Sequence, residues 1–346
     1  MVHLGRSYLC AVGLITAFAA SSVSRAADIE SALIERAKKE GQVTFYTNLI
    51  VNQVVRPVAS AFEKKYAIKV NVSRADSQTT ILKLVNESRA GRTEVDVWNL
   101  SSGLKSFVEA GIIRKFTAAN AAEYPGAYKD SNGFWVATNV YVNTPGFNTQ
   151  LVPASEAPKT LNDLLDPKWK GKLAWKPNDV SGAVGFIGNV LTSMGEDRGM
   201  TYLRQFARQD PITVEASARA ILDRVIAGEY PIALQIFNHH AVISAGKGAP
   251  VSWIPMEPAT VSLQLAGITR DAPHPNAALL FIEFMLSEEG QKIFQEAEYL
   301  PAHPKVPART PSLKPEGGGF KATVLSPEIM DKGIDHWADV YKRLFR

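Results

Sequence analysis

Cysteine is almost absent from this sequence, which has one, Cys10, among 346 residues. A single cysteine forms no disulfide within the chain, so small disulfide-stabilised scaffolds are excluded. The fold must therefore be held together by its hydrophobic core. A chain of this length exceeds what one core usually supports, and we expect two lobes.

Apolar stretches long enough to cross a bilayer are also missing. The apolar stretch near the N-terminus, residues 8–20, is too short for this, and Arg6 gives it a positive start. Ser24 and Ala26 supply small residues at the two positions that a signal peptidase reads. We predict a signal peptide over residues 1–26, cleaved after Ala26, with a retained membrane anchor as the alternative.

Cleavage after Ala26 bears on the compartment in which the protein works. Cys10 lies inside the apolar stretch rather than at its end, which argues against a lipid anchor through this residue. The mature chain would then contain no cysteine. An exported protein without disulfides is typical of the bacterial periplasm, so we predict a soluble periplasmic protein.

A marked excess of either charge is missing as well. The chain has 38 Lys and Arg against 34 Asp and Glu, a net charge of +4 that falls to +2 without Arg6 and Arg25. Nucleic-acid binding requires a clustered basic face, whereas these charges are spread along the chain. We therefore expect no nucleic-acid partner.

Familiar catalytic motifs are absent too. The sequence has no G-x-S-x-G, no H-E-x-x-H and no phosphate loop ending in Gly-Lys-Ser/Thr. Paired catalytic carboxylates have no fixed spacing in sequence, so an enzyme stays a minority alternative. We predict a binding protein without a cofactor.

Residues 41–116 do carry a pattern, an alternation of apolar strands with amphipathic helices. The expected strands are 43–46, 68–72 and 95–98, and the expected helices are 54–62, one opened by 81–85, and a short closing one. Such units connect through right-handed crossovers and leave a crevice at the carboxyl ends of the strands. We expect an α/β fold that binds a small ligand at this edge.

The rest of the chain predicts a crossing, a second lobe and a return. The expected strands are 134–142, 170–175, 232–236, 251–254 and 261–268, and the expected helices are one that starts at Thr160, 179–194, 215–226, 241–245, 276–286, 288–295 and one within 326–345. We expect residues 145–148 to turn into the second lobe and residues 261–268 to form the return crossing. Asp96 is assigned to fold support.

Several short stretches, in order along the chain, resemble those of a known family. They are 45–46 (FY), 61–66 (AFEKKY), 94–98 (EVDVW), 110–113 (AGII), 164–173 (LLDPKWKGKL), 228–230 (GEY), 274–278 (HPNAA) and 287–291 (SEEGQ). On these motifs the chain resembles the class II periplasmic solute-binding proteins of ABC importers, in the branch that includes the ferric-iron-binding proteins.

The resemblance implies a two-lobed α/β periplasmic-binding-protein fold of type II, with two crossing strands as hinge. Lobe 1 would comprise residues 27–138 and 265–305, and lobe 2 would comprise residues 139–264 and 306–346. In ferric-binding relatives, two adjacent tyrosines hold the metal, often with a glutamate and a histidine. Here the tyrosine pair falls on residues 238–240 (NHH), the glutamate falls on Ser101, and the histidine falls near Leu49. Bare ferric iron is therefore not the expected ligand.

The candidate ligand-binding residues are mostly neutral hydrogen-bond donors. They are Asn48, Ser101 and Ser102 at strand ends, Ser181 before a glycine-spaced helix, Arg219, and Asn238, His239 and His240. For Ser181 an ordinary helix cap is the alternative, for Arg219 a surface ion pair, and for the two histidines an exposed turn. Arg74 is a weaker candidate, and aromatic residues such as Tyr141 are expected to fill cores.

These residues predict capture of a small anionic or polar organic solute between two lobes. The protein, a monomer, would deliver this solute to an ABC permease in the inner membrane. One alternative is uptake of ferric iron or a metal chelate. Another is presentation of the solute to a membrane sensor.

Overall fold

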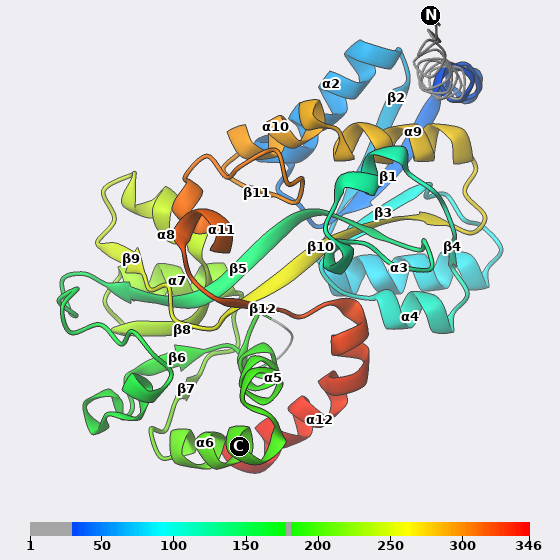
Figure 1. The fold of residues 1–346 in the computed structure, drawn as a ribbon. Coiled ribbons are helices and arrows are strands. Elements are labelled where there is room, and N and C mark those ends of the chain that lie inside the picture. The colour runs from blue at the N-terminus through cyan, green and yellow to red at the C-terminus, as the bar shows by residue number, and fades with distance from the viewer. Residues whose placement is uncertain (1–29, 178–180) are drawn as a thin grey trace, which may run out of the picture.

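One sheet runs through the whole molecule. The computed structural model describes residues 30–177 and 181–346 as an α/β protein with a twelve-stranded sheet (Figure 1). The predicted signal peptide, residues 1–26, and the start of the predicted helix 179–194 lie outside these described residues. The main path of the sheet has the order β2-β1-β3-β10-β5-β8-β6-β7. Its strands are β1 (Gln42–Thr47), β2 (Lys69–Arg74), β3 (Val97–Leu100), β5 (Val136–Asn148), β6 (Leu173–Trp175), β7 (Ile212–Thr213), β8 (Ile232–Phe237) and β10 (Ala259–Thr269).

The first half of the molecule confirms the alternation predicted for residues 41–116. β1 lies between β2 and β3 and is parallel to both. Helices surround these strands: α2 (Arg56–Tyr66), α3 (Ser77–Arg89), α4 (Leu104–Glu109), α9 (Pro275–Leu286) and α10 (Glu288–Glu296). A π-helical turn, η1 (Val51–Val55), precedes α2. In the core of this half, the Phe281 ring meets those of Phe45 and Phe62 edge to face, with centroid distances of 5.1 and 4.9 Å.

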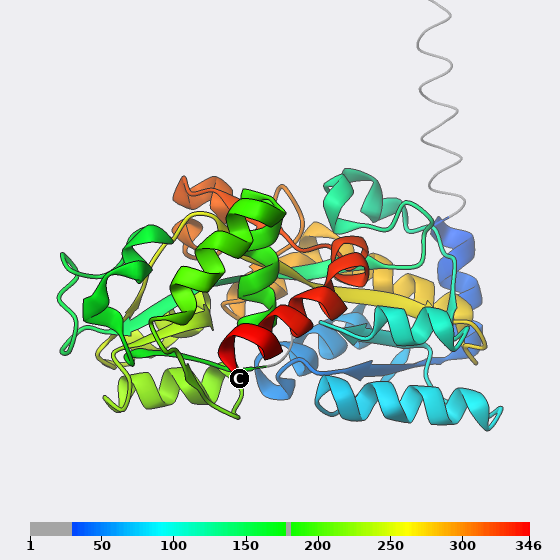
Figure 2. The same ribbon diagram turned by 90° about the horizontal axis from the view of Figure 1, so that it is seen from below.

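Two long strands, β5 and β10, join the two halves, as Figures 1 and 2 show. They are antiparallel to each other, and every residue of both strands is buried. β10 pairs with β3 of the first half, whereas β5 pairs with β8 of the second. The predicted return crossing at 261–268 is therefore confirmed.

The turn predicted at residues 145–148 is wrong, because β5 continues to Asn148. Proline lacks a backbone N–H and is tolerated in a strand at a bulge, and the register of β5 against β8 shifts here, between Thr144 and Gly146. The carbonyl of Pro145 still accepts a hydrogen bond from the Ile254 N–H. The bulge thus accommodates Pro145 within the strand, although sequence patterns assign this proline to a turn.

The second half packs helices against the far strands. They are α5 (Ala183–Met194), α6 (Glu196–Ala207), α7 (Ala218–Ile226), α8 (Asn238–Ala245) and α12 (Pro327–Phe345), and the edge strand β9 (Val251–Trp253) pairs with β5. α6 was not predicted from the sequence. The helix predicted from Thr160 is only a 3₁₀ turn, Asn162–Leu165. The Asp163 carboxylate holds this turn by accepting from the Lys159 and Thr160 N–H groups.

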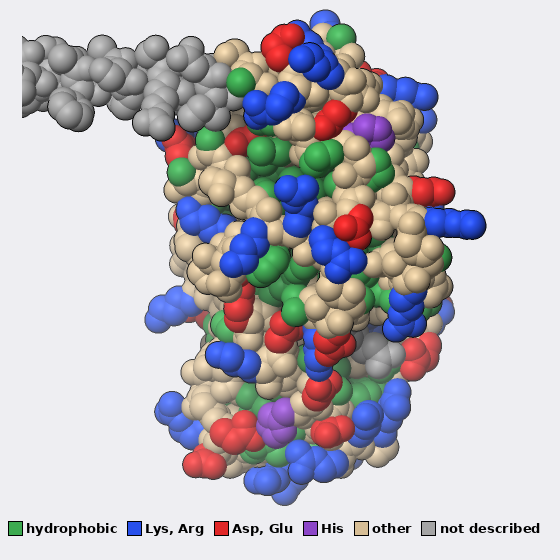
Figure 3. Space-filling view, turned by 90° about the vertical axis from the view of Figure 1, so that its right-hand side faces the viewer, with side chains coloured by type: hydrophobic (Ala, Val, Ile, Leu, Met, Phe, Trp, Pro, Cys, Tyr) green, Lys and Arg blue, Asp and Glu red, His purple; other side chains and the backbone are tan. Residues whose placement is uncertain are grey.

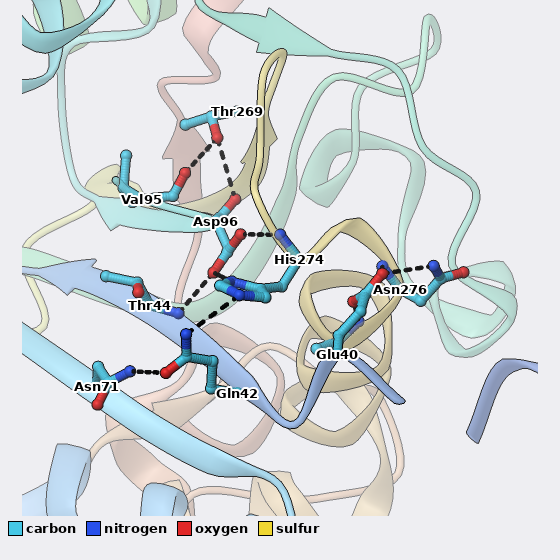
Figure 4. A network of polar contacts seen from close by, with 10 residues as sticks. Glu40, Gln42, Thr44, Asn71, Val95, Asp96, Thr269, His274 and Asn276 are labelled. Atoms are coloured by element: carbon cyan, nitrogen blue, oxygen red, sulfur yellow. Dashed lines mark hydrogen bonds and ion pairs between the residues drawn. The ribbon is translucent and has the colours of Figure 1, made fainter. Parts of the chain in front are cut away.

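A buried carboxylate ties the first half together (Figure 4). Asp96 is fully buried next to β3. It accepts from the Thr44 N–H at 2.7 Å and from the His274 N–H at 2.6 Å, and its Oδ2 lies 3.0 Å from His274 Nδ1. These contacts join β1, β3 and the start of α9, as expected of a residue that supports the fold.

The surface mixes charges of both signs. Acidic and basic side chains alternate over the face shown in Figure 3. Within the described residues, no helix is both long and apolar enough to span a membrane.

Candidate functional site

A cavity of about 390 Å³ lies between the two halves, at the carboxyl ends of β1, β2 and β3. Its lining residues are Asn48, Arg74, Asp76, Ser77, Gln78, Ser101 and Ser102 from the first half, Tyr141 and Ser262 from the crossing strands, and Lys176, Ser181, Ser217, Ala218, Arg219 and Phe237 from the second half. A hollow of about 680 Å³ near residues 115–136 is larger, but only the first half lines it. The cavity between the halves is therefore the candidate ligand site.

Strand ends place the residues of the first half in this cavity. Asn48 follows β1 directly, and Ser101 and Ser102 follow β3. Gly103 then has a φ of 104°, a conformation that favours glycine, and α4 begins at the next residue. Because parallel strands end at the same edge of a sheet, side chains at three strand ends converge on one site.

Helix N-termini supply further lining residues from both sides. Asp76 caps α3 by accepting from the Thr79 N–H at 3.0 Å, and Ser77 and Gln78 form the first turn. Opposite, Ser217 caps α7 by accepting from the Ala220 N–H at 3.1 Å. The first amides of a helix have no intrahelical acceptor, and the helix dipole favours negative charge at this end. Both helices therefore favour an anion between them.

Among the described residues that line the cavity, three are cations and one is a carboxylate. Arg219 donates to both carboxylate oxygens of Asp223, at 2.6 and 3.3 Å, and to the Ser244 hydroxyl at 3.0 Å. Lys176 lies 3.3 Å from the Ser181 hydroxyl, and Arg74 makes only a long contact of 3.5 Å with the Asn48 carbonyl.

The carboxylate among the described lining residues is that of Asp76, and its pKa is lowered. Hydrogen bonds from the Thr79 side chain and then from the Thr79 backbone stabilise its ionised form. Asp76 therefore stays ionised at neutral pH, where its carboxylate can accept a hydrogen bond from a donor group of the ligand.

Five of the eight residues predicted to bind ligand line this cavity: Asn48, Ser101, Ser102, Ser181 and Arg219. Asp76, Ser77 and Ser217 also line the cavity but were not predicted. Asp76 carries a readable signal, as a helix-capping residue shortly after the predicted strand 68–72, whereas Ser217 fell inside the predicted helix 215–226. Arg74 was a weaker candidate, and Tyr141, predicted to fill a core, is buried and also borders the cavity.

Asn238, His239 and His240 are not among the lining residues. Asn238 is fully buried and donates to the Leu313 carbonyl at 2.8 Å. His239 is buried behind two lining residues, with its ring centroid 6.0 Å from that of Tyr141 and 5.9 Å from that of Phe237. Direct ligand contact by this stretch stays a prediction.

Burial holds both histidines in the neutral form. Desolvation, followed by the charges of His240 and Arg219, lowers the pKa of His239 well below its usual value. Desolvation and Arg219 likewise lower the pKa of His240 to about 4. Neither nitrogen of the His239 ring has a hydrogen-bond partner among the described residues.

Stability is therefore expected to fall as the pH drops below about 6.5, the pKa of histidine in an unfolded chain. Above this pH both states are neutral and the full stability is present. Below it the unfolded chain takes up protons that the folded protein refuses, until the folded pKa values, about 4 for His240, are reached. Thermal unfolding of the wild type and of His239→Phe across this pH range measures the effect, and we expect a flatter curve for the variant. The exposed His336→Gln is the control, and parallel curves for wild type and His239→Phe would contradict the prediction.

A ligand-sized cavity between two α/β halves, which a pair of buried strands joins, defines a two-lobed solute-binding architecture. Residues 100–316 match the family described as bacterial extracellular solute-binding protein, and the chain belongs to this family. It is thus a solute-binding protein and not an enzyme, as predicted.

Individual relatives agree with this assignment. The Fe(3+)-binding periplasmic protein of Serratia marcescens is 24% identical over 252 residues, which cover 70% of this chain and 73% of that protein. FutA of Trichodesmium, in complex with iron and citrate, has a TM-score of 0.74 at 20% identity and matches 88% of this chain and 99% of its own. AfuA of Actinobacillus pleuropneumoniae, with exogenous fructose-6-phosphate bound, has a TM-score of 0.67 at 21% identity, over 88% of this chain and 96% of its own. The two-lobed fold is therefore shared.

Proposed function

We propose that the protein captures a small organic anion, of the phosphate monoester or phosphonate class, between its two lobes. The observation that carries this proposal is the set of charges among the described lining residues, where Arg74, Lys176 and Arg219 outnumber Asp76. Cations that converge on one site from two separate halves favour a ligand of negative charge, because each forms a charge-assisted hydrogen bond with an oxyanion.

The helix ends support an oxyanion in particular. Ser77 and Gln78 of α3 and Ala218 and Arg219 of α7 belong to first turns, and all four line the cavity. Backbone N–H groups at such positions suit phosphate and carboxylate oxygens. The carboxylate of Asp76 adds an acceptor, which suits a phosphate that keeps one proton or a ligand that also carries an amine or a hydroxyl.

The size and the apolar part of the site support an organic ligand. A cavity of about 390 Å³ falls in the range of small-molecule sites and exceeds what inorganic phosphate needs. Tyr141 and Phe237 stack at 4.6 Å between centroids, and both border the cavity. Their rings offer an apolar surface to the carbon skeleton of the ligand. The fructose-6-phosphate bound to AfuA belongs to this class of compounds.

Ferric iron is the less favoured ligand. Of the lining residues in the described part of the chain, Tyr141 is the one tyrosine, and its burial raises its pKa, which opposes the phenolate form. Within the described residues, no group of three or more His, Cys, Asp or Glu side chains could hold a metal. The test below also detects binding of iron together with an organic anion.

We also propose where the protein acts and how it passes on its ligand. The signal peptide directs export and is cleaved after Ala26, the monomer closes its lobes about β5 and β10, and the closed form delivers the solute to an inner-membrane ABC permease. The lobe boundaries predicted from the sequence belong to this proposal. The hydrophobic core of the first half also includes Ala308, Leu313 and Phe320, three residues that these boundaries assign to lobe 2.

The test is to find the natural ligand and to measure its class. Native mass spectrometry of protein purified from its own periplasm should show an organic adduct that is absent from the denatured protein. Isothermal titration with fructose 6-phosphate, glycerol 3-phosphate, citrate and ferric citrate should show binding of a phosphate ester and none of ferric citrate. An iron adduct, or binding of ferric citrate alone, would contradict the proposal. Loss of uptake of the identified solute in a deletion strain distinguishes a permease from a sensor as partner.

A further inference from the structure

A chain of directed hydrogen bonds runs from the crossing strand β10 to the wall of the cavity. Gln264 is fully buried on β10. Its Nε2 donates to Asn48 Oδ1 at 2.6 Å, and to the carbonyl and the Oδ1 of Asn99, each at 3.0 Å. Its Oε1 accepts from the Tyr141 hydroxyl at 3.4 Å. Every neighbour of Nε2 is an acceptor, so the Gln264 amide has only one favourable orientation.

The orientation of Asn99 is fixed in the same way. Its Nδ2 donates to the Thr138 hydroxyl at 3.0 Å and to the Leu265 carbonyl at 3.2 Å. Its Oδ1 accepts from the Thr47 hydroxyl at 3.2 Å as well as from Gln264. Asn99 is fully buried, so a reversed amide would leave these groups unpaired at a high cost in free energy. Asn99 thus holds the Gln264 amide in its orientation.

Asn48 extends this hydrogen-bond network to two serines of the cavity wall. Because Asn48 Oδ1 faces Gln264, Asn48 Nδ2 must face the other way, and it donates to Ser77 Oγ at 2.7 Å and to Ser101 Oγ at 3.2 Å. Each serine oxygen is therefore an acceptor within the protein. A hydroxyl has one proton. Because each serine oxygen accepts in its contact with Asn48, the serine proton is left to be donated to another group. Within the contacts of the described residues, neither serine hydroxyl donates, and both side chains line the cavity.

We infer that Gln264 is a positioning residue for ligand selectivity. By fixing the amide of Asn48, it turns the Ser77 and Ser101 hydroxyls into hydrogen-bond donors toward the ligand. This wall of the cavity then favours an oxygen that accepts two hydrogen bonds, such as an ionised phosphate oxygen, over an ammonium or another group that only donates. The inference rests on the proposed function and adds to it the residue that sets the direction of these bonds.

A first experiment tests, without any ligand, whether Gln264 fixes the orientation of the Asn48 amide. In ¹⁵N-labelled protein, the side-chain amide protons of Asn48, assigned by their loss in Asn48→Asp, should exchange slowly with solvent. In Gln264→Leu we expect their exchange to become at least about tenfold faster, because the amide is free to turn. Unchanged exchange in this variant overturns the inference.

A second experiment follows the effect on binding, with fructose 6-phosphate as the probe. In the wild type, Ser101→Ala should weaken binding about tenfold, the size expected for one hydrogen bond to a charged oxygen. Asn48→Asp keeps the bond from Gln264, but its second carboxylate oxygen accepts only, so it captures the Ser101 proton. In this background, and in Gln264→Leu, Ser101→Ala should change the dissociation constant less than about twofold.

Ser102→Ala is the matched control, since Ser102 shares the cavity wall and Asn48 makes its two side-chain amide contacts with Ser77 and Ser101. Its effect on binding should be the same in all three backgrounds. An equal effect of Ser101→Ala in all three backgrounds overturns the inference. If fructose 6-phosphate does not bind the wild type, the proposed ligand class fails, while the exchange experiment still decides the role of Gln264. Because Asn48 is only partly buried, Asn48→Asp is expected to fold even if Gln264→Leu does not.

Discussion

Asp96→Ala is expected to lower the free energy of unfolding by about 3–5 kcal/mol, the range for removing one partner from a buried charged network. The variant leaves the N–H groups of Thr44 and His274 without their acceptor in the interior, and it removes the contact with His274 Nδ1. Urea unfolding followed by circular dichroism measures the change. Since the network joins two strands to α9, we expect the whole first half to lose stability.

Two further variants make this prediction specific. Asp96→Asn keeps the shape of the side chain and one acceptor oxygen, so its effect should be intermediate. Asp271→Ala removes an exposed carboxylate whose partner is Arg270, and such surface pairs contribute only up to about 1 kcal/mol. Equal unfolding free energies for Asp96→Ala and Asp271→Ala would show that the network contributes little.

The Arg74→Gln, Arg219→Gln double variant is expected to bind the natural organic anion at least about 100-fold more weakly, with each lost charged hydrogen bond contributing roughly a factor of ten. Arg74 comes from the end of β2 and Arg219 from the first turn of α7, so the two cations approach the ligand from opposite lobes. The variant also leaves Asp223 without its guanidinium partner, which adds to the repulsion of an anion. Isothermal titration at low and high salt measures the loss.

The salt series separates a direct role of these arginines from damage to the fold. Wild-type binding should weaken as salt increases, because charges that are partly exposed are screened, and binding by the variant should depend less on salt. Lys105→Gln removes a cation that pairs with Asp335 outside the cavity, and it should leave the affinity unchanged. An affinity of the double variant close to that of the wild type would show that the ligand is not held by its charge.

The parts of the fold that the sequence predicts are those with a strong local pattern. β1 contains an apolar run with a polar break behind it, β2 alternates apolar and polar residues, and a helix follows each of them at close spacing. The 3₁₀ turn at Asn162–Leu165 shows the limit, since a correct capping contact at Asp163 does not decide how far a helix extends. The continuation of β5 through Pro145 depends on β8 and the Ile254 N–H, which are distant in sequence.

The same distinction holds for the site. Residues at strand ends, such as Asn48 and Ser101, are predictable because parallel topology alone brings them to one edge. The position of His239 depends on packing, since α8 begins directly after β8 and its first turn lies behind Tyr141 and Phe237. No pattern within residues 238–240 contains this information. Gln264 escapes sequence analysis for the same reason, because its role comes from partners on β1 and β3.

The path of β5 and β10 also sets the order in which the protein can fold. The core of the first half is built from residues 33–142 and 259–320, whereas one core of the second half lies wholly within residues 174–251. A chain that emerges from the ribosome N-terminus first can close the latter core early. The first half is begun first but is completed only after β10 and α9 have emerged, because β3 pairs with β10. The other core of the second half waits longer still, for Trp337 and Val340 of α12. Such late completion keeps the new chain open to a translocation channel, which suits the export proposed above.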